Sequence, residues 1–125
     1  MKLHSTLTQQ YQTVTAYDKD SVELNAIRYN YSLVVLPEVA PTAWPVSRFE
    51  DLSKEHFAQL EATQPDVIIL GTGPKQRFVH PKLISSLTEK RIGVECMDSQ
   101  AACRTYNILM AEGRKVALAL IMETA

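Results

Sequence analysis

The segment MDSQAACRTYNIL, residues 97–109, places a cysteine, an arginine and an asparagine in what the pattern predicts to be a helix. Cys103 falls in the first part of that helix, where the helix dipole lowers the pKa of a thiol. Arg104 beside it is expected to lower that pKa further, which makes Cys103 the best candidate nucleophile of the chain. The alternative is a buried cysteine acting as a small hydrophobe, because no histidine is placed to assist it: the histidines are scattered at His4, His56 and His80.

Arg104 is unexpected near the start of a helix, since that end already carries partial positive charge. Its neighbours are mostly apolar, so we expect a largely buried helix whose guanidinium needs partners for its five donors. Asp98, the backbone carbonyls of residues 71–73, or a carboxylate or anion from outside are the candidates. Asn107 lies three residues further and shares a helix face with Arg104. The pair is expected either to join the helix to residues 71–73 or to face a ligand or partner.

Gly71-Thr72-Gly73 follows an apolar run, and glycines at a strand end let the backbone approach a ligand. The dinucleotide fingerprint requires a glycine at position 76, which is Gln76, and Pro74 removes a donor that a phosphate would use. A tight turn is the simpler interpretation. Just beyond it, Lys75, Arg77 and His80 form either an anion-binding patch or a solvated loop.

The elements that position these residues are predicted from hydrophobic patterning. Residues 53–62 are expected to form a helix capped by Ser53, and residues 67–70 a strand buried on both faces. A second helix is expected to start at His80-Pro81. After it follow a strand at 94–97, the helix capped by Asp98 or Ser99 and ended by Gly113, and a last strand at 116–122.

Residues 11–50 have a β-rich pattern. A hairpin is expected around Asp18-Lys19-Asp20. Ile27, Tyr29 and Tyr31 alternate with polar residues, which predicts a strand with one buried face. The segment 37–45 contains three prolines and is expected to be an irregular connection, pinned by Trp44. The fold class is therefore α/β: a single three-layer domain over residues 1–125, with a mixed central sheet flanked by helices and a β-rich start followed by αβαβαβ.

Composition excludes several classes of protein. The chain has 125 residues, a net charge of −1 and 46% hydrophobic residues, typical of a globular domain without an electrostatic footprint for nucleic acid. Two cysteines are too few for a disulfide scaffold, and their spacing does not suggest a zinc site. No apolar run approaches the length of a membrane span, and no secretory signal is visible, so a cytoplasmic location is expected. No nucleophile elbow or short-chain dehydrogenase pattern is present.

The stretch from residue 67 to residue 121 resembles a known family. The resemblance rests on the Gly71-x-Gly73 turn, on residues 95–98 (ECMD), on residues 101–109 (AACRTYNIL) and on Glu112-Gly113-Arg114. The chain is similar to the small α/β domains of unknown function grouped with mitochondrial complex I assembly factor 3 and the adipogenesis-associated domain proteins. This resemblance implies a three-layer domain, no established enzymatic activity and no catalytic residues to transfer.

Two functions are therefore expected as alternatives. The first is a non-catalytic interaction or assembly module, linked through the resemblance to respiratory complex I, with protein partners and no cofactor. The second is a small-molecule or anion-binding domain, or a weak enzyme. The candidate ligand- or partner-binding residues are Gly71, Gly73, Lys75, Arg77, Cys103, Arg104 and Asn107. Exposed strand edges in the β-rich part would also allow a homo-oligomer.

Overall fold

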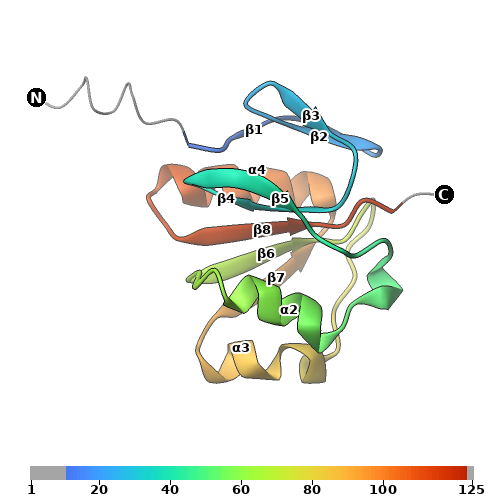
Figure 1. The fold of residues 1–125 in the computed structure, drawn as a ribbon, viewed down its shortest axis with the longest axis vertical. Helices are drawn as coiled ribbons and strands as arrows, with labels where there is room; N and C mark the ends of the chain where they lie inside the picture. The colour runs from blue at the N-terminus through green and yellow to red at the C-terminus, as the bar shows by residue number, and fades with distance from the viewer. Residues whose placement is uncertain (1–10, 124–125) are drawn as a thin grey trace, which may run out of the picture.

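A computed structural model of the protein describes residues 11–123. The β-rich start and the following αβαβαβ order are confirmed (Figure 1). The strands and helices of the first part are β1 (Val14–Asp18), β2 (Ser21–Leu24), β3 (Ile27–Tyr29), β4 (Leu33–Leu36), β5 (Val39–Ala43) and the 3-10 helix η1 (Phe49–Asp51). Those of the second part are α2 (Lys54–Glu61), β6 (Val67–Gly71), the 3-10 helix η2 (Pro81–Ile84), α3 (Ser85–Glu89), β7 (Gly93–Met97), α4 (Ser99–Ala111) and β8 (Val116–Leu120).

The central sheet is mixed, as predicted. Its five strands lie in the order β5-β4-β8-β6-β7. Strands β6, β7 and β8 run parallel to one another, while β4 is antiparallel to both β5 and β8. The carboxyl ends of β6 and β7 therefore reach the same edge of the sheet, where the glycine turn and the start of α4 follow them.

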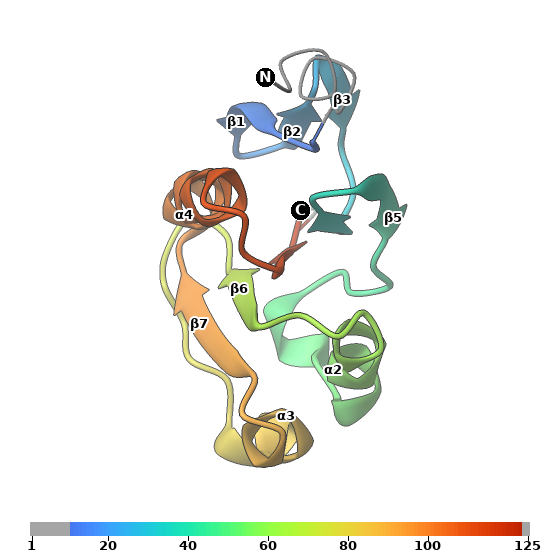
Figure 2. The ribbon, with the colours of Figure 1, turned by 90° about the vertical axis from the view of Figure 1, so that its left-hand side faces the viewer.

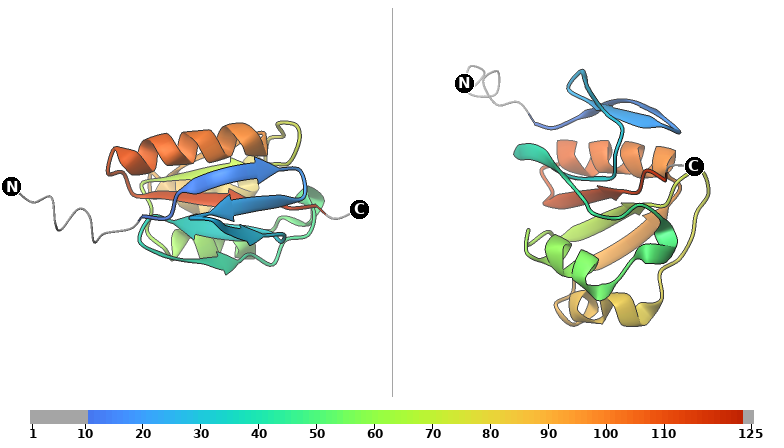
Figure 3. Two further views of the ribbon diagram at one scale, coloured as in Figure 1. Left: turned by 90° about the horizontal axis from the view of Figure 1, so that it is seen from above. Right: turned by 45° about the vertical axis from the view of Figure 1, so that its right-hand side comes forward.

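The sheet is covered on both faces, which makes the domain three-layered. Helices α2 and α3 cover one face, while α4 and the three-stranded sheet β1-β2-β3 share the other (Figure 2). The view from above shows β1 lying beside α4 in that layer (Figure 3). Alternate residues of β8 face opposite cores: Ala117 and Ala119 lie in the cluster with Phe57 and Leu60 of α2. Leu118 and Leu120 lie in the other cluster, with Ala102 and Tyr106 of α4.

The β1–β2 hairpin forms as expected, with antiparallel pairing from Asp18↔Ser21 outward. The expected buried face at Ile27, Tyr29 and Tyr31 is wrong: Ile27 is 59% and Tyr31 47% exposed. Ile27 pairs with Leu24 and so shares its face. Strand β3 nevertheless forms the outer edge of its sheet, so nothing covers Ile27.

The prediction of an irregular connection over residues 37–45 is also wrong. Val39–Ala43 form strand β5, paired with β4. Proline cannot donate a hydrogen bond to a neighbouring strand, but β5 is an edge strand of the central sheet, where Pro41 costs no ladder bond on the open side. The prediction that Trp44 anchors this segment is confirmed, because its side chain is 3% exposed.

The helix starts agree with the capping signals. Ser53 is the N-cap of α2, and its backbone N–H donates to His56 Nδ1 at 3.0 Å. Asp98 is the N-cap of α4, and its Oδ1 accepts the N–H of Ala101 at 2.9 Å. The helix predicted from Pro81 begins there as the 3-10 turn η2, capped by His80, and continues as α3.

Candidate functional site

The glycine turn and the start of α4 are joined by direct hydrogen bonds. The N–H of Gly73 donates to Ser99 Oγ at 2.8 Å, and the N–H of Ser99 donates to the Gly73 carbonyl at 2.8 Å. A Cβ added to Gly71 would lie 2.6 Å from Leu120 Cδ2 and 2.9 Å from Ser99 Oγ. Gly73 has φ +93°, which favours glycine. Both glycines are therefore required by close packing and by the turn itself.

Thr72 holds the turn in place, a role that the sequence analysis did not assign to it. Its side chain is 1% exposed, and its hydroxyl lies 2.7 Å from the Lys75 carbonyl and 3.0 Å from the Met97 carbonyl. The same oxygen accepts the N–H of Arg77 at 3.2 Å. Hydroxyl bonds to nearby backbone groups are typical of turns, so the threonine between two glycines was the available signal.

Residues 74–80, here called the basic loop, pass along the open edge of β7. Gln76 Nε2 donates to the carbonyl of Cys96 in that strand at 2.8 Å. Arg77 is bound within the chain, since it lies 3.1 Å from Glu50, 3.8 Å from Glu123 and over the Phe49 ring at 5.3 Å. Lys75 is exposed. Of the two cations in this loop, only Lys75 extends into solvent.

Phe78 is the residue of the basic loop that sequence reasoning missed. Its side chain is 75% exposed, the most of the large hydrophobic residues between 11 and 123. No periodic pattern surrounds it, so the sequence carried no signal for its orientation. An exposed aromatic ring on the same hydrogen-bonded loop as Lys75 is suited to contact another molecule.

The expected burial of Arg104 is wrong. Cys103 and Tyr106 point into the core, and with 3.6 residues per turn this orientation leaves Arg104 exposed. No ion pair or side-chain hydrogen bond links Arg104 to another residue between 11 and 123, and the Asp98 side chain is occupied by the helix cap. Arg104 therefore does not join α4 to the glycine turn.

Asn107 has a structural contact, but with a different partner from the one expected. Its Oδ1 accepts the N–H of Val14 and its Nδ2 donates to the Val14 carbonyl, both at 2.9 Å. The amide thus occupies the free edge of β1 as a neighbouring strand would. The hydroxyl of Tyr106 donates to the Gln12 carbonyl at 2.7 Å and strengthens the same junction. Asn107 and Arg104 consequently do not act as a pair on the glycine turn.

The hypothesis of an activated Cys103 thiol is contradicted. The side chain is 4% exposed, and burial raises its pKa to about 12 despite the opposing charge of Arg104. Tyr17 of β1 lies against Ser99 beside it, and burial also raises the pKa of that phenol. Cys103 is a small core residue, the alternative that the sequence left open. Burial also raises the pKa of Cys96.

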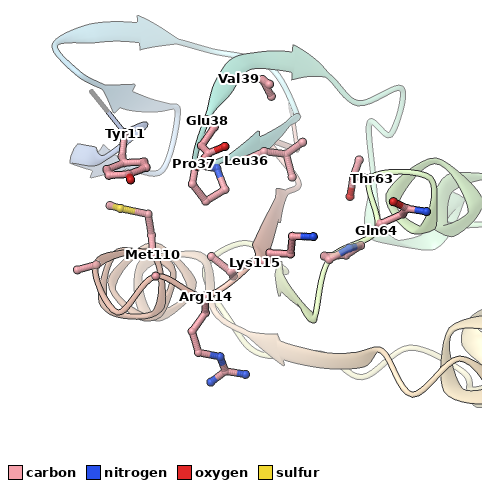
Figure 4. A pocket seen from close by; sticks show the side chains of 14 residues that line it. Tyr11, Leu36, Pro37, Glu38, Val39, Thr63, Gln64, Met110, Arg114 and Lys115 are labelled. Atoms are coloured by element: carbon pink, nitrogen blue, oxygen red, sulfur yellow. The ribbon is translucent and has the colours of Figure 1, made fainter. Parts of the chain in front are cut away.

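A cavity of about 420 Å³ lies at the other end of the parallel strands (Figure 4). It is open to solvent and is bordered by the turn between β4 and β5, the loop after α2 and the segment between α4 and β8, with Tyr11 at one side. Sequence patterns do not reveal it, because its walls come from four segments that are distant in sequence. None of the candidate binding residues predicted from the sequence lines it.

Two kinds of feature were not found in the described part of the chain, a cluster of metal ligands and a helix that could cross a membrane. Between residues 11 and 123, no three His, Cys, Asp or Glu side chains lie together so that they could hold a metal ion. In the same range, no helix is both long and apolar enough to cross a bilayer. The backbone N–H groups of Thr72 and Gly73 are bonded within the chain, so the groups exposed near this turn along the chain include Phe78, Lys75 and Arg104.

The geometry defines a three-layer α/β domain with an exposed aromatic loop at one end of its sheet and a cavity at the other. Residues 14–121 match a family described as a protein of unknown function (DUF498/DUF598). The chain belongs to this family, and the resemblance noted from its sequence is confirmed.

Two relatives have informative names. The chain is 33% identical over 90 residues to NADH dehydrogenase (ubiquinone) 1 alpha subcomplex assembly factor 3 of Mus musculus. That match covers 70% of this chain but 48% of the mouse protein, so the chain spans about half the length of that relative. It is 31% identical to the 13 kDa major membrane protein of Francisella tularensis subsp. holarctica (strain LVS), over 84% of this chain and 86% of that one.

Solved structures support the fold. A crystal structure of a Bordetella parapertussis protein superposes with a TM-score of 0.87 and 40% sequence identity. The superposition covers 91% of this chain and 98% of the Bordetella chain. The same layers and strand order therefore extend across the domain.

Proposed function

We propose that this protein is a non-catalytic interaction module that acts in the assembly of respiratory complex I by binding a partner protein through the basic loop. The exposure of Phe78 on a braced loop carries the proposal. A complex I assembly factor among the relatives supports it. Aromatic residues dominate the binding energy of protein interfaces, and burying one large apolar side chain stabilises a complex by about 1.5–3 kcal/mol.

The loop is organised before any partner arrives. Thr72 fixes its start, the Gln76 amide ties it to β7, and Arg77 ties it to Glu50 and Phe49. A loop held at three points loses little conformational freedom on binding, which favours affinity. Lys75 adds positive charge to the same loop and has no ion-pair partner between residues 11 and 123. The matching partner surface is an apolar pocket with a carboxylate at its rim.

The proposal is tested by affinity capture from native cells, with complex I subunits identified by mass spectrometry. Phe78→Asp is expected to abolish the recovery of complex I subunits, and Lys75→Glu is expected to reduce it. Tyr31→Asp is the matched control, since Tyr31 is another exposed aromatic residue outside the basic loop. Loss of complex I assembly on native gels after deletion of the gene should be rescued by Tyr31→Asp but not by Phe78→Asp. Equal recovery of subunits with all three variants would refute the proposed interface.

Arg104 tests how far the interface extends. Because the side chain is exposed on α4, whose first residue bonds to Gly73, Arg104→Ala leaves the fold intact while removing a cation from this end of the molecule. Reduced capture of the same subunits would place α4 in the interface. Unchanged capture would confine the interface to the basic loop.

A further inference from the structure

The cavity at the amino ends of β6 and β8 lies away from the glycine turn and takes no part in the proposed partner contact. Its volume of about 420 Å³ lies within the range of sites that hold small ligands, roughly 300–1,000 Å³. Its walls are built from the backbone on several sides: the Lys115 carbonyl accepts the N–H of Asp66, and the Pro37 carbonyl accepts the N–H of Gln12. These bonds fix two of the segments that border the cavity, which is open to solvent on its polar side, where Thr63, Gln64 and Lys115 are exposed.

The cavity is polarised from one side to the other. Figure 4 shows Tyr11, Pro37 and Met110 gathered on one side, while Lys115, Thr63 and Gln64 lie toward the other. The first group offers an aromatic ring, a proline ring and a thioether, and the exposed carboxylate of Glu38 lies next to Pro37 on this side (Figure 4). The second offers an ammonium group, a hydroxyl and a carboxamide. A ligand that fills both halves must have an apolar end and a polar end.

The cation of the lining is exposed to solvent at the polar side of the cavity. Lys115 extends between Leu36 and Gln64, whereas the neighbouring Arg114 turns away from the cavity (Figure 4). No carboxylate between residues 11 and 123 lies within 4.0 Å of the Lys115 ammonium group. Glu38 on the β4–β5 turn is the one acidic residue of the lining, and it forms no ion pair in the same range. The exposed Lys115 ammonium group thus has hydrogen-bond donors to offer an anion at the polar side of the cavity.

The backbone presents the Gln64 side chain at unusual geometry. Gln64 has φ +55°, a conformation that glycine adopts at lower cost. Its N–H donates to the Glu61 carbonyl and ends helix α2. Glycine would satisfy the turn but would leave the cavity without this carboxamide.

We propose that this cavity binds a monocarboxylate with a single medium-length hydrocarbon tail. The carboxylate accepts hydrogen bonds from Lys115 and the Gln64 amide, and the tail lies between Tyr11, Pro37 and Met110. Charge-assisted hydrogen bonds are the stronger ones, so the carboxylate rather than the tail sets the chemical selectivity.

The test titrates the full-length protein with decanoate, decanol and decylamine, followed by amide chemical shifts and calorimetry. Decanoate is expected to shift the residues around the cavity and to bind more tightly than decanol or decylamine. Lys115→Met keeps the aliphatic part of the side chain and removes its charge. It should lower the affinity for decanoate about tenfold, as expected for the loss of one hydrogen bond to a charged group. Arg114→Met is the matched control and should leave the affinity unchanged.

Two further variants locate the bound molecule. Val39→Trp places a bulky ring at an exposed position of the lining and should block decanoate. Gln64→Gly suits the backbone and should weaken decanoate while the protein stays folded. The proposal is overturned if decanoate causes no shifts at millimolar concentration, or if Lys115→Met and Arg114→Met bind it equally. Equal affinity for decanol and decanoate would also overturn it, because the cavity would then select only for a hydrocarbon tail.

Discussion

Gly71 is the position at which helix α4, strand β8 and the glycine turn come closest together. Replacing it with alanine would place a methyl group 2.6 Å from Leu120 Cδ2 and 2.9 Å from Ser99 Oγ. Overpacking of this kind costs about 1–3 kcal/mol. We therefore expect Gly71→Ala to lower the free energy of unfolding by that amount, measured by urea denaturation.

Gly93 provides the control for that measurement. A Cβ there would meet only Val67 Cγ2, at 3.9 Å, and the residue lies in a strand with ordinary backbone geometry. Gly93→Ala should be neutral or slightly stabilising, since alanine restricts the unfolded chain. Equal destabilisation by both variants would mean that the close approach at Gly71 does not decide its residue type.

Asn107 and Arg104 should differ sharply in their effect on stability. Asn107→Ala leaves the N–H and carbonyl of Val14 without their partners, and unmet groups of this kind cost about 1–3 kcal/mol. Arg104→Ala removes an exposed side chain and should change stability by no more than about 0.5 kcal/mol. Thermal or chemical unfolding of both variants checks this order. A larger loss for Arg104→Ala would contradict the contacts described above.

Cys103 should be unreactive in the native protein. Its pKa of about 12 leaves a far smaller thiolate fraction near pH 7.5 than an ordinary thiol of pKa about 8.5 has. In a Cys96→Ser variant, labelling by a disulfide reagent should be about a thousandfold slower than in denaturant. Rapid labelling of the native chain at neutral pH would restore the hypothesis of an activated nucleophile.

The orientation of α4 explains why sequence reasoning misplaced Arg104. The helix has apolar residues around most of its circumference, which predicts burial on most sides. One of them, Ile108, is 59% exposed and shares the outer face with Arg104. The composition of a helix does not predict which of its faces a neighbouring sheet will cover. The short contact between Gly73 and Ser99 sets this rotation, and that contact is tertiary.

At the scale of elements, the strands and helices of residues 53–122 were predictable, whereas strand β5 and the exposure of β3 were not. Strands β6 and β8 are apolar throughout, so they could only lie inside. Strand β5 contains a proline and β3 an exposed isoleucine. Both strands lie at sheet edges, where one side of the strand is unpaired and the alternation of buried and exposed residues is less strict. The cavity was invisible because its walls meet only after the β4–β5 turn folds beside the end of α4.

The β1–β2 hairpin should depend on pH through Asp18. Its carboxylate accepts the N–H groups of Asp20 at 2.9 Å and Ser21 at 2.8 Å, and the Asp20 hydrogen bond contributes most to lowering its pKa. A carboxyl whose pKa is lower in the folded state stabilises the protein above its unfolded pKa, about 3.9, and this contribution is lost as the pH falls through the folded pKa.

The melting temperatures of wild type and Asp18→Asn should therefore differ most near pH 6 and converge as the pH falls toward 2. Asp20→Asn is the control, since its carboxylate accepts no hydrogen bond from residues 11–123. A difference between wild type and Asp18→Asn that stays constant with pH would assign the effect of Asp18 to packing instead of charge.

At the scale of the whole molecule, the two proposed surfaces lie at opposite ends of the same strands. Strand β6 begins beside the cavity and ends at the glycine turn, roughly 13 Å away at about 3.3 Å per residue. The strand between them is buried at every position and pairs with neighbours on both sides. Nothing in this rigid strand provides two alternative arrangements through which one end could bias the other.

We therefore expect the two surfaces to act independently. Lys115→Met should leave the capture of complex I subunits unchanged, and Phe78→Asp should leave decanoate affinity unchanged. In the double variant, the stability changes should add within about 0.5 kcal/mol, because effects at separations above about 10 Å with no shared partners are additive. Capture in the presence of saturating decanoate, compared with capture in its absence, measures coupling directly. A decanoate-dependent change in subunit recovery that Lys115→Met abolishes would show that the cavity regulates the loop, and would require a second arrangement of β6 or of helix α4 beside it.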